Sequence, residues 1–419
     1  MTARIFRSLR KHRNYRLFFM GQVVSLAGTW MQNIALAWFV VELTDSPIAV
    51  GVLAFCRFFP FMVFGLYAGV IADRFDNRRL VMATQAAQMA VSIALTVLVF
   101  SGWESLPVVY ALALLGGTGL VFDAPGRQSL TFQMVGRDEL PNAVALNTGL
   151  FNGARVIGPA IAGVVIAAAG VGVCFAINSV TFLAVLAALA LMRDDELHTV
   201  ERDQPKRALA AIREGIAYAW RHQEVRLALI VLAVASTVGF NFHVILPVLA
   251  ADTLHTGPEV FGILSACFGA GALLGALVQA ARAKASWIGL LAGATGFSGG
   301  LVVLAPVTSA ALAGVVLFAV GICFTIWVSN TSALLQLSAP DRLRGRVMSL
   351  FMFAFAGLTP LGGLWAGWVM DVGGTQLALT LGGLVSLTVI AYAWAQMPAI
   401  RRARRVAPAP ETEEVSQAA

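Results

Sequence analysis

The amino-acid sequence predicts an all-α membrane protein of twelve transmembrane helices, arranged as two six-helix bundles. Three observations support this prediction: the chain is unusually apolar, its apolar residues form twelve runs of spanning length, and Lys and Arg cluster in alternate connections. Of 419 residues, 58% are hydrophobic and only 12% are charged, with a mean hydropathy of +0.80. A soluble protein has about 25% charged residues because its surface faces water. Most of this surface must therefore face lipid.

Each span is placed where about 20 consecutive residues are predominantly apolar, the length that crosses a bilayer core. The expected spans of the first half are 16–42, 48–72, 80–101, 107–130, 143–169 and 172–192. Those of the second half are 226–251, 259–281, 286–306, 309–336, 345–370 and 375–397.

The distribution of positive charge predicts the orientation of the chain. Basic residues precede the first span and occupy every second connection. The intervening connections contain neither Lys nor Arg, and several of them contain acids, at Glu42, Asp45, Glu104, Asp252, Glu259 and Asp371. Because loops rich in Lys and Arg stay on the cytoplasmic side, both termini are expected in the cytoplasm. The protein is therefore expected to be a multi-pass protein of the cell (inner) membrane.

Four regions are expected along the chain. Residues 1–192 form the first bundle, 193–225 a cytoplasmic linker, 226–397 the second bundle and 398–419 a disordered cytoplasmic tail. Pro205 can begin a helix in the linker, and apolar residues then follow at helical spacing, at Leu209, Ile212, Ile216 and Trp220. This pattern predicts an interfacial helix. The tail is basic and then rich in Pro and Glu, which is typical of disorder.

A weak internal repeat relates the two halves. Gly65, Gly69 and Arg78 recur as Gly271, Gly275 and Lys284, each 206 residues later. Matched halves of this kind place a transport pathway between them, near the middle of the bilayer.

Several other classes of protein do not fit the sequence. The net charge of +7 is spread over short connections rather than a basic soluble domain, which argues against binding of nucleic acid. The cysteines stand apart within apolar runs, so we expect small core residues and neither a metal site nor disulfides. No nucleotide-binding loop or nucleophile–base pairing is visible, so we expect a protein without enzyme activity or cofactors. Its expected partners are a small-molecule substrate, protons and the lipid bilayer, and we expect a monomer.

One connection has a distinctive motif. Residues 69–79, after the second span, are Gly-Val-Ile-Ala-Asp-Arg-Phe-Asp-Asn-Arg-Arg. They resemble the Gly-x-x-x-Asp-Arg-x-x-x-Arg-Arg loop signature that the major facilitator superfamily has between spans two and three. The resemblance implies the major facilitator fold and secondary transport by alternating access.

Finer motifs resemble a subgroup of bacterial effluxers that includes the enterobactin exporter and the macrolide efflux proteins. They are Asn14-Tyr-Arg16, Leu43-Thr-Asp-Ser46, Arg57-Phe-Phe-Pro60, Asp123-Ala-Pro-Gly-Arg127-Gln128, Gly158-Pro159-Ala-Ile-Ala-Gly163 and Asp341-Arg-Leu-Arg-Gly-Arg346-Val347. The segment that contains Gly158, Pro159 and Gly163 is similar to the span-five motif of antiporters, although Ala154 and Ala162 replace usual glycines. The resemblance therefore implies export.

The resemblance also implies a gate at the cytoplasmic ends of spans two to four, formed by Asp73, Arg74, Arg78, Asp123 and Arg127. In the family, the loop Asp caps the N-terminus of span eleven, where the helix dipole favours an anion, and the loop Arg pairs with a span-four acid. Asp123 has two alternatives: it carries a proton, or it pairs with Arg127 one turn away, which we favour. The structural alternative for all five charged residues is that they only orient the loop and lie in solvent. Because the second half has Gln279 in place of the acid, an acidic gate is expected only in the first half.

Arg57 and Arg155 stand inside apolar runs, away from any basic connection. At 1.5 Å per helical residue, each is expected about 15–20 Å into the membrane, from opposite sides. A buried Arg is costly and usually faces a cavity or a partner, and no acid of the first half lies at that depth. The functional hypothesis is that both line the central cavity and attract an anionic or carbonyl-rich substrate. The structural alternative is that they bond to helix-end carbonyls or to Asn147, Asn152 and Asn178.

Three further polar residues are cavity candidates at membrane depth. His243 could titrate during proton coupling, or remain neutral and bond to a neighbouring helix. Gln32 and Asn33 either line the cavity or form hydrogen bonds between helices.

These observations predict a secondary active transporter that exports a small amphipathic or lipophilic molecule, drug-like or siderophore-like, in exchange for protons. The alternatives are an importer or a lipid translocator of the same fold, and a membrane sensor that transports nothing.

Overall fold

The computed structural model describes residues 6–65, 67–68, 74–198, 208–282 and 284–406, and no strand occurs among them. Ten helical segments within these ranges are long and apolar enough to cross a membrane. Two of them contain a break: Leu106–Ala169 departs from helical geometry at Gly136, and Arg342–Pro398 departs from it at Gly373 and Gly374. Because 64 residues of unbroken helix would be about three times as long as a bilayer core is thick, each of these two segments crosses twice. The expected number of twelve spans is confirmed.

The helices of the first bundle are α2 (Arg7–Lys11), α3 (Arg13–Thr44), α4 (Pro47–Phe64), α6 (Asn77–Phe100), α7 (Leu106–Ala169) and α8 (Val171–Ala190). A short helix, η1 (Asp194–Glu196), and α9 (Ala208–Arg221) follow in the linker. The second bundle contains α10 (Gln223–Val234), η2 (Ala235–Gly239), α11 (Phe242–Val248), η3 (Leu249–Thr253), α12 (Pro258–Arg282), α13 (Trp287–Leu304), α14 (Ala310–Ser338), α15 (Asp341–Met352), η4 (Phe353–Gly357) and α16 (Thr359–Val406).

Some expected boundaries are wrong. The second span was expected to reach residue 72; α4 ends at Phe64, four residues after the internal Pro60, and residues 69–72 lie outside the described part of the chain. The expected connection at 131–142 is helical on both sides of Gly136, where a φ of 68° reverses the chain within one residue. A left-handed φ costs glycine little because it lacks a Cβ. The tail was expected to be disordered from 398, yet α16 continues through Pro398 to Val406.

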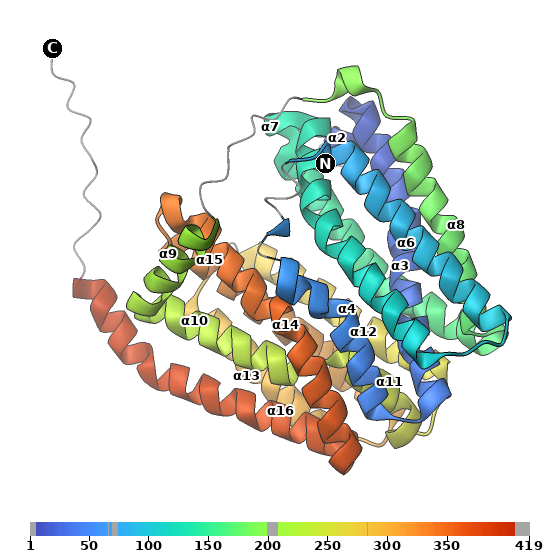
Figure 1. Ribbon diagram of the computed structural model, residues 1–419. Coiled ribbons are helices and arrows are strands. Elements are labelled where there is room, and N and C mark those ends of the chain that lie inside the picture. The colour runs from blue at the N-terminus through green and yellow to red at the C-terminus, as the bar shows by residue number, and fades with distance from the viewer. Residues whose placement is uncertain (1–5, 66, 69–73, 199–207, 283, 407–419) are drawn as a thin grey trace.

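The bundles contact each other along two pairs of helices, α4 with α16 and α7 with α12. Figure 1 shows the first bundle at upper right and the second at lower left, with α4 and α12 between them. Glycines make both contacts possible. A Cβ on Gly51 would lie 2.7 Å from the carbonyl oxygen of Gly363, and one on Gly163 would lie 2.8 Å from that of Pro258. Only residues without a side chain allow backbones to approach so closely.

These glycine contacts lie toward one end of the molecule, which we call the acidic end because its connections contain Glu42, Asp45, Glu104 and Glu259. Toward the opposite, basic end, α7 and α12 separate around an apolar cavity of about 310 Å³ lined by Gly153, Ile157 and Leu277 among others. A Cβ on Gly149 or Gly153 would meet no atom within 4 Å. The described helices are thus packed together at the acidic end and apart at the basic end.

The linker helix α9 is tied to the second bundle at the basic end. Glu214 forms ion pairs with Arg346 and, at 2.8 Å, with Arg342, both in α15. The Tyr218 hydroxyl donates to the Ser338 carbonyl at 2.6 Å, and burial raises the pKa of this hydroxyl, so it stays a donor. Ile216 and Trp220 are 49% and 68% exposed. The exposed apolar face agrees with a helix that lies at the membrane surface.

Inside the first bundle, α4 and α7 cross where Gly117 meets the backbone of Arg57. We expect Gly117→Ala to destabilise the protein, because the added Cβ would overlap the carbonyl oxygen of Arg57, and overpacking costs about 1–3 kcal/mol. Gly149→Ala, also in α7, is the matched control, since its Cβ would meet no atom within 4 Å. Thermal unfolding of the purified variants in detergent measures the difference. Equal melting temperatures for the two variants would contradict the tight crossing.

Candidate functional site

Asp123 is the centre of a buried polar network in the first bundle. It is 2% exposed, and its Oδ1 accepts hydrogen bonds of 2.8 Å from the Thr84 hydroxyl and from the Gln85 amide, both in α6. Its Oδ2 accepts from Arg127 Nε at 2.9 Å and forms an ion pair with Nη2 of the same side chain. The expected pairing of Asp123 with Arg127 is present. Four donors thus surround this one buried carboxylate.

Arg127 extends the network to α3. Its Nη1 donates to Gln22 Oε1, and its guanidinium lies 5.9 Å from the centre of the Phe18 ring. The network therefore links α3, α6 and α7 within the first bundle. Neither Thr84, Gln85 nor Gln22 was expected from the sequence, because polar residues on the inner face of an apolar helix give no signal of their partner.

The other gate residues do not join this network. Arg78 Nε donates to the Leu189 carbonyl at 2.8 Å and Nη2 to that of Ala190 at 3.0 Å, and Nη1 pairs with Asp194. The resemblance implied that a loop Arg pairs with the span-four acid, and for Arg78 this is wrong. Arg78 instead caps the last turn of α8, where a cation is favoured by the helix dipole. Arg74 is exposed, and Asp73 lies outside the described residues.

The equivalent region of the second bundle contains amides. Gln279 stands 206 residues after Asp73, and Asn330 stands 203 residues after Arg127. Asn330 Nδ2 donates to Gln279 Oε1 at 2.9 Å, and Asn330 Oδ1 accepts from the Ser286 backbone N–H at 2.9 Å. The contact between Asn330 and Gln279 is uncharged, and the corresponding pair of the first half cannot be compared with it because Asp73 lies outside the described residues.

Arg57, Gln32 and Asn33 line one polar cavity, but it lies among helices of the first bundle, from α3 to α8, rather than between the bundles. The space open to the centre of a water-sized sphere is about 20 Å³, far below the several hundred Å³ of a drug-sized site. The Gln32 amide oxygen accepts from Asn178 at 2.7 Å. Arg57 has neither a hydrogen bond nor an ion pair within the part of the chain that the structure describes. The expected place of Arg57 in the wall of a large central cavity therefore stays a prediction.

Arg155 lies at the contact between the bundles, on three aromatic rings. Its guanidinium carbon is 4.8 Å from the centre of the Phe268 ring in α12, 5.4 Å from that of Phe324 in α14 and 5.9 Å from that of Trp30 in α3. We call these three rings the aromatic platform. A cation over aromatic faces is stabilised by about 2 kcal/mol when it is desolvated. None of Asn147, Asn152 and Asn178, the alternative partners, bonds to Arg155.

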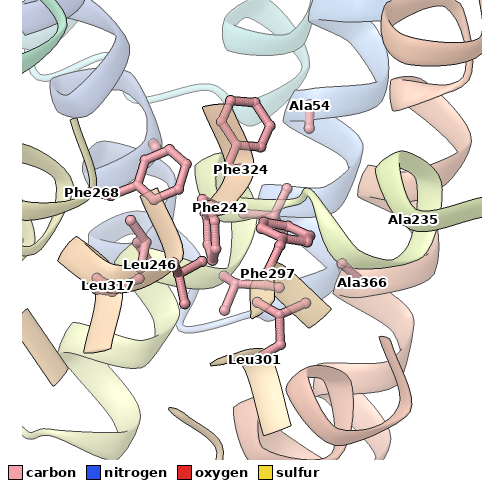
Figure 2. Packing of buried hydrophobic residues seen from close by; sticks show 14 of the residues in the cluster. Ala54, Ala235, Phe242, Leu246, Phe268, Phe297, Leu301, Leu317, Phe324 and Ala366 are labelled. Atoms are coloured by element: carbon pink, nitrogen blue, oxygen red, sulfur yellow. The ribbon is translucent and has the colours of Figure 1, made fainter. Parts of the chain in front are cut away.

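The platform is continuous with the core of the second bundle. Phe324 stacks on Phe240 with ring centres 4.4 Å apart, and Phe242 lies 4.6 Å from Phe268. Figure 2 shows Phe242, Phe268, Phe297 and Phe324 converging from different helices. This arrangement could not be predicted from the sequence, since Phe residues in apolar spans are common and only the fold brings these four together.

His243 lies on the second bundle opposite Arg57. Its ring meets Phe58 edge to face, with centres 5.1 Å apart. Its Nε2 is buried without a hydrogen-bond partner among the described residues, so the expected alternative of a bond to a neighbouring helix is not found at this atom. His243 and Arg155 therefore both lie where the two bundles meet.

The antiporter-like segment forms the contact of α7 with two helices. A Cβ on Gly158 would lie 2.5 Å from Trp30 Cβ in α3, while the Pro159 carbonyl approaches Gly262 in α12. Gly163 packs against the start of α12, as described above. This segment therefore joins the first bundle to the second at the acidic end.

A family model described as "Transmembrane secretion effector" matches residues 6–417. The staphyloferrin A transporter of Staphylococcus aureus is 27% identical over 386 residues, which cover 90% of this chain and 95% of that protein. The multidrug efflux pump Tap of Mycolicibacterium fortuitum is 27% identical and covers 85% of this chain and 89% of its own length. The macrolide efflux protein A of Streptococcus pyogenes is 22% identical, covering 64% and 68%.

Solved structures share the fold. A peptide transporter POT superposes with a TM-score of 0.76 at 13% identity, covering 93% of this chain and 95% of its own. The nucleoside transporter NupG gives 0.71 at 9% identity, covering 91% and 99%. With the fold, the two-bundle contact and the match over nearly the whole length in place, the chain belongs to the transmembrane secretion effector family of the major facilitator superfamily and is a secondary transporter.

Proposed function

We propose that this chain exports small amphipathic or lipophilic molecules, drug-like or siderophore-like, from the cytoplasm by alternating access, in exchange for protons. Relatives named for macrolide efflux, multidrug efflux and staphyloferrin A transport support this chemistry. The basic connections support a cytoplasmic location of both termini. In that orientation, the basic end, where the described helices are apart, faces the cytoplasm, and the protein is poised to take up a substrate from inside.

The observation that supports this function most directly is the position of Arg155 on the aromatic platform. The Arg155 guanidinium lies on the Phe268 and Phe324 rings, so a positive charge and aromatic surface are next to each other. A substrate with an anionic or carbonyl group beside an apolar body matches both surfaces. Because Arg155 has no carboxylate partner among the described residues, its charge is available to such a group.

Alternating access requires that the bundles separate at one end and close at the other. The contacts of Gly51 with Gly363 and of Gly163 with Pro258 close the acidic end here. Asp73, Arg74, Arg78, Asp123 and Arg127 would close the basic end in the opposite state, with the buried pair of Asp123 and Arg127 as its fixed base. His243, whose Nε2 lacks a partner at the bundle contact, is the proposed proton carrier.

Accumulation assays test the function. Cells that lack the gene are expected to accumulate, and to be more sensitive to, at least one compound in a panel of lipophilic antibiotics and iron chelators. Restoring the gene should reverse both effects, and an uncoupler that collapses the proton gradient should remove the protection. Lower accumulation in the deletion strain would contradict export and indicate uptake. Export that persists with the uncoupler would contradict proton exchange.

A further inference from the structure

The cavity around Arg57 has the features of a site for one small ligand. It is lined by Thr29, Gln32, Asn33, Arg57, Gln88 and Asn178, together with apolar residues, and no carboxylate lines it. The centre of a water-sized sphere can occupy about 20 Å³ of this cavity. Since about 10–15 Å³ suffices for one such particle, the cavity holds one or two of them.

The polar groups of this cavity are incompletely paired. Asn178 donates to Gln32, and the Thr29 hydroxyl donates to the Ser25 carbonyl. Arg57 and Gln88, by contrast, have no hydrogen bond among the described residues, and Asn33 Oδ1 is buried without a partner. The cavity therefore combines a guanidinium and an amide without a hydrogen bond to the described residues, together with the Asn33 amide, whose buried unpaired atom is its oxygen.

A positive charge at this depth needs an anion. Isolated charges in a medium of low dielectric are costly, and they are retained where a counter-charge or a polar ligand compensates them. Within the described residues, the nearest ring to Arg57 is that of Phe58, at 6.0 Å, and no protein carboxylate pairs with it. Five guanidinium N–H groups and two amide groups are donors, which suit a ligand that only accepts hydrogen bonds.

We propose that this cavity binds one small monovalent anion, such as chloride, between Arg57, Gln88 and Asn33. The site is separate from the aromatic platform, and it depends neither on the substrate nor on the direction of transport. Bound there, the anion neutralises the guanidinium and links α3, α4 and α6 inside the first bundle.

The glycines of α7 provide a way to fill the site without breaking the fold. Gly116 lines the cavity, and a Cβ there would lie 3.8 Å from its nearest neighbour. Gly116→Ala is therefore expected to fold normally and to take up part of the space of the anion. Arg57→Gln removes the charge, and Arg155→Gln is the control that removes the other membrane-depth cation.

The test is thermal unfolding of purified, substrate-free protein in detergent, followed by tryptophan fluorescence at constant ionic strength in chloride, bromide, formate or gluconate. Chloride and bromide should raise the melting temperature of the wild type saturably over gluconate. Arg57→Gln should lose this response, Gly116→Ala should weaken the apparent chloride affinity at least about tenfold, and Arg155→Gln should keep it.

The proposal would be overturned by the same melting temperature of wild type in every salt, or by an equal chloride response in Arg57→Gln. If only formate stabilises, the site still takes an anion, and that anion is a carboxylate group such as one on a substrate. Should Arg57→Gln fail to fold, Gln88→Leu and Asn33→Leu serve in its place and should each weaken chloride binding. A chloride response that both of them leave unchanged would also overturn the site.

Discussion

Replacing Arg155 with glutamine is expected to raise the apparent KM for an exported anionic or carbonyl-rich substrate by about 10- to 100-fold. A hydrogen bond to a charged group contributes about 1.5–3 kcal/mol, and each 1.4 kcal/mol corresponds to a factor of ten in affinity. Arg155→Lys should recover only part of the loss, because an ammonium group cannot lie flat on Phe268 as a guanidinium does. Transport into inverted membrane vesicles measures both variants, with the compound identified by the accumulation assay.

The matched control for this substitution is Arg16→Gln. It removes the same charge from an exposed side chain of α3, outside the platform, and should leave KM unchanged. Phe324→Leu tests the aromatic contribution separately and should produce a smaller loss than Arg155→Gln, since it keeps the charge. An unchanged KM for Arg155→Gln at normal protein levels would show that Arg155 does not contact the substrate.

Replacing Asp123 with asparagine is expected to destabilise the first bundle by about 3–5 kcal/mol. Removal of one partner from a buried ion pair leaves the other charge uncompensated. Among the described residues, the Arg127 guanidinium otherwise contacts only the Gln22 amide and the Phe18 ring. Thermal unfolding in detergent measures the loss. The double variant Asp123→Asn, Arg127→Gln should be less destabilised than the sum of the two single variants, because neither charge then remains alone.

Asp194→Asn provides the control for the Asp123 experiment. Asp194 also pairs with an arginine, Arg78, but its side chain is 80% exposed. Exposed ion pairs contribute about 0–1 kcal/mol, so this substitution should change the melting temperature little. If Asp123→Asn were equally harmless, the buried network would be neutral to stability, and its charges would have to be explained by gating alone.

Much of the architecture was predictable from the sequence because lipid imposes a simple requirement. Each span needs a long apolar run, and those runs are visible in the composition, including the Gly-rich helix α13 at Trp287–Leu304. The connection near residue 137 was harder to predict. Polar residues between Arg137 and Asn142 suggest a loop, yet this segment remains helical and Gly136 alone reverses the chain. Its polar side chains find partners in α2, where Arg7 and Lys11 pair with the buried Glu139.

The site was predictable only where partners are close in sequence. Arg127 lies one helical turn after Asp123, so their pairing could be inferred from spacing. Arg57 and Arg155, in contrast, both lie in apolar runs and were expected at a similar depth in the membrane. Their surroundings in the fold nevertheless differ. The crossing of α4 over Gly117 directs Arg57 to a cavity inside the first bundle, whereas the packing of α7 on α12 places Arg155 on aromatic rings. Tertiary packing decides this difference, and no local pattern encodes it.

Both membrane-depth guanidiniums belong to the first bundle, in α4 and α7, and neither is neutralised by a carboxylate among the described residues. In the second bundle, the residue that corresponds to Arg127 is the uncharged Asn330, which donates a hydrogen bond to the Gln279 amide. A voltage across the membrane therefore exerts force on one bundle more than on the other. If rocking moved both guanidiniums through a tenth of the electric field while the Arg57 cavity held no anion, 100 mV would shift the balance between the two states by about 0.5 kcal/mol, or about twofold. With the anion bound, the charge of Arg155 alone would contribute about half of that free energy. We expect the resting polarity of the cell to bias this transporter even when its cargo is neutral.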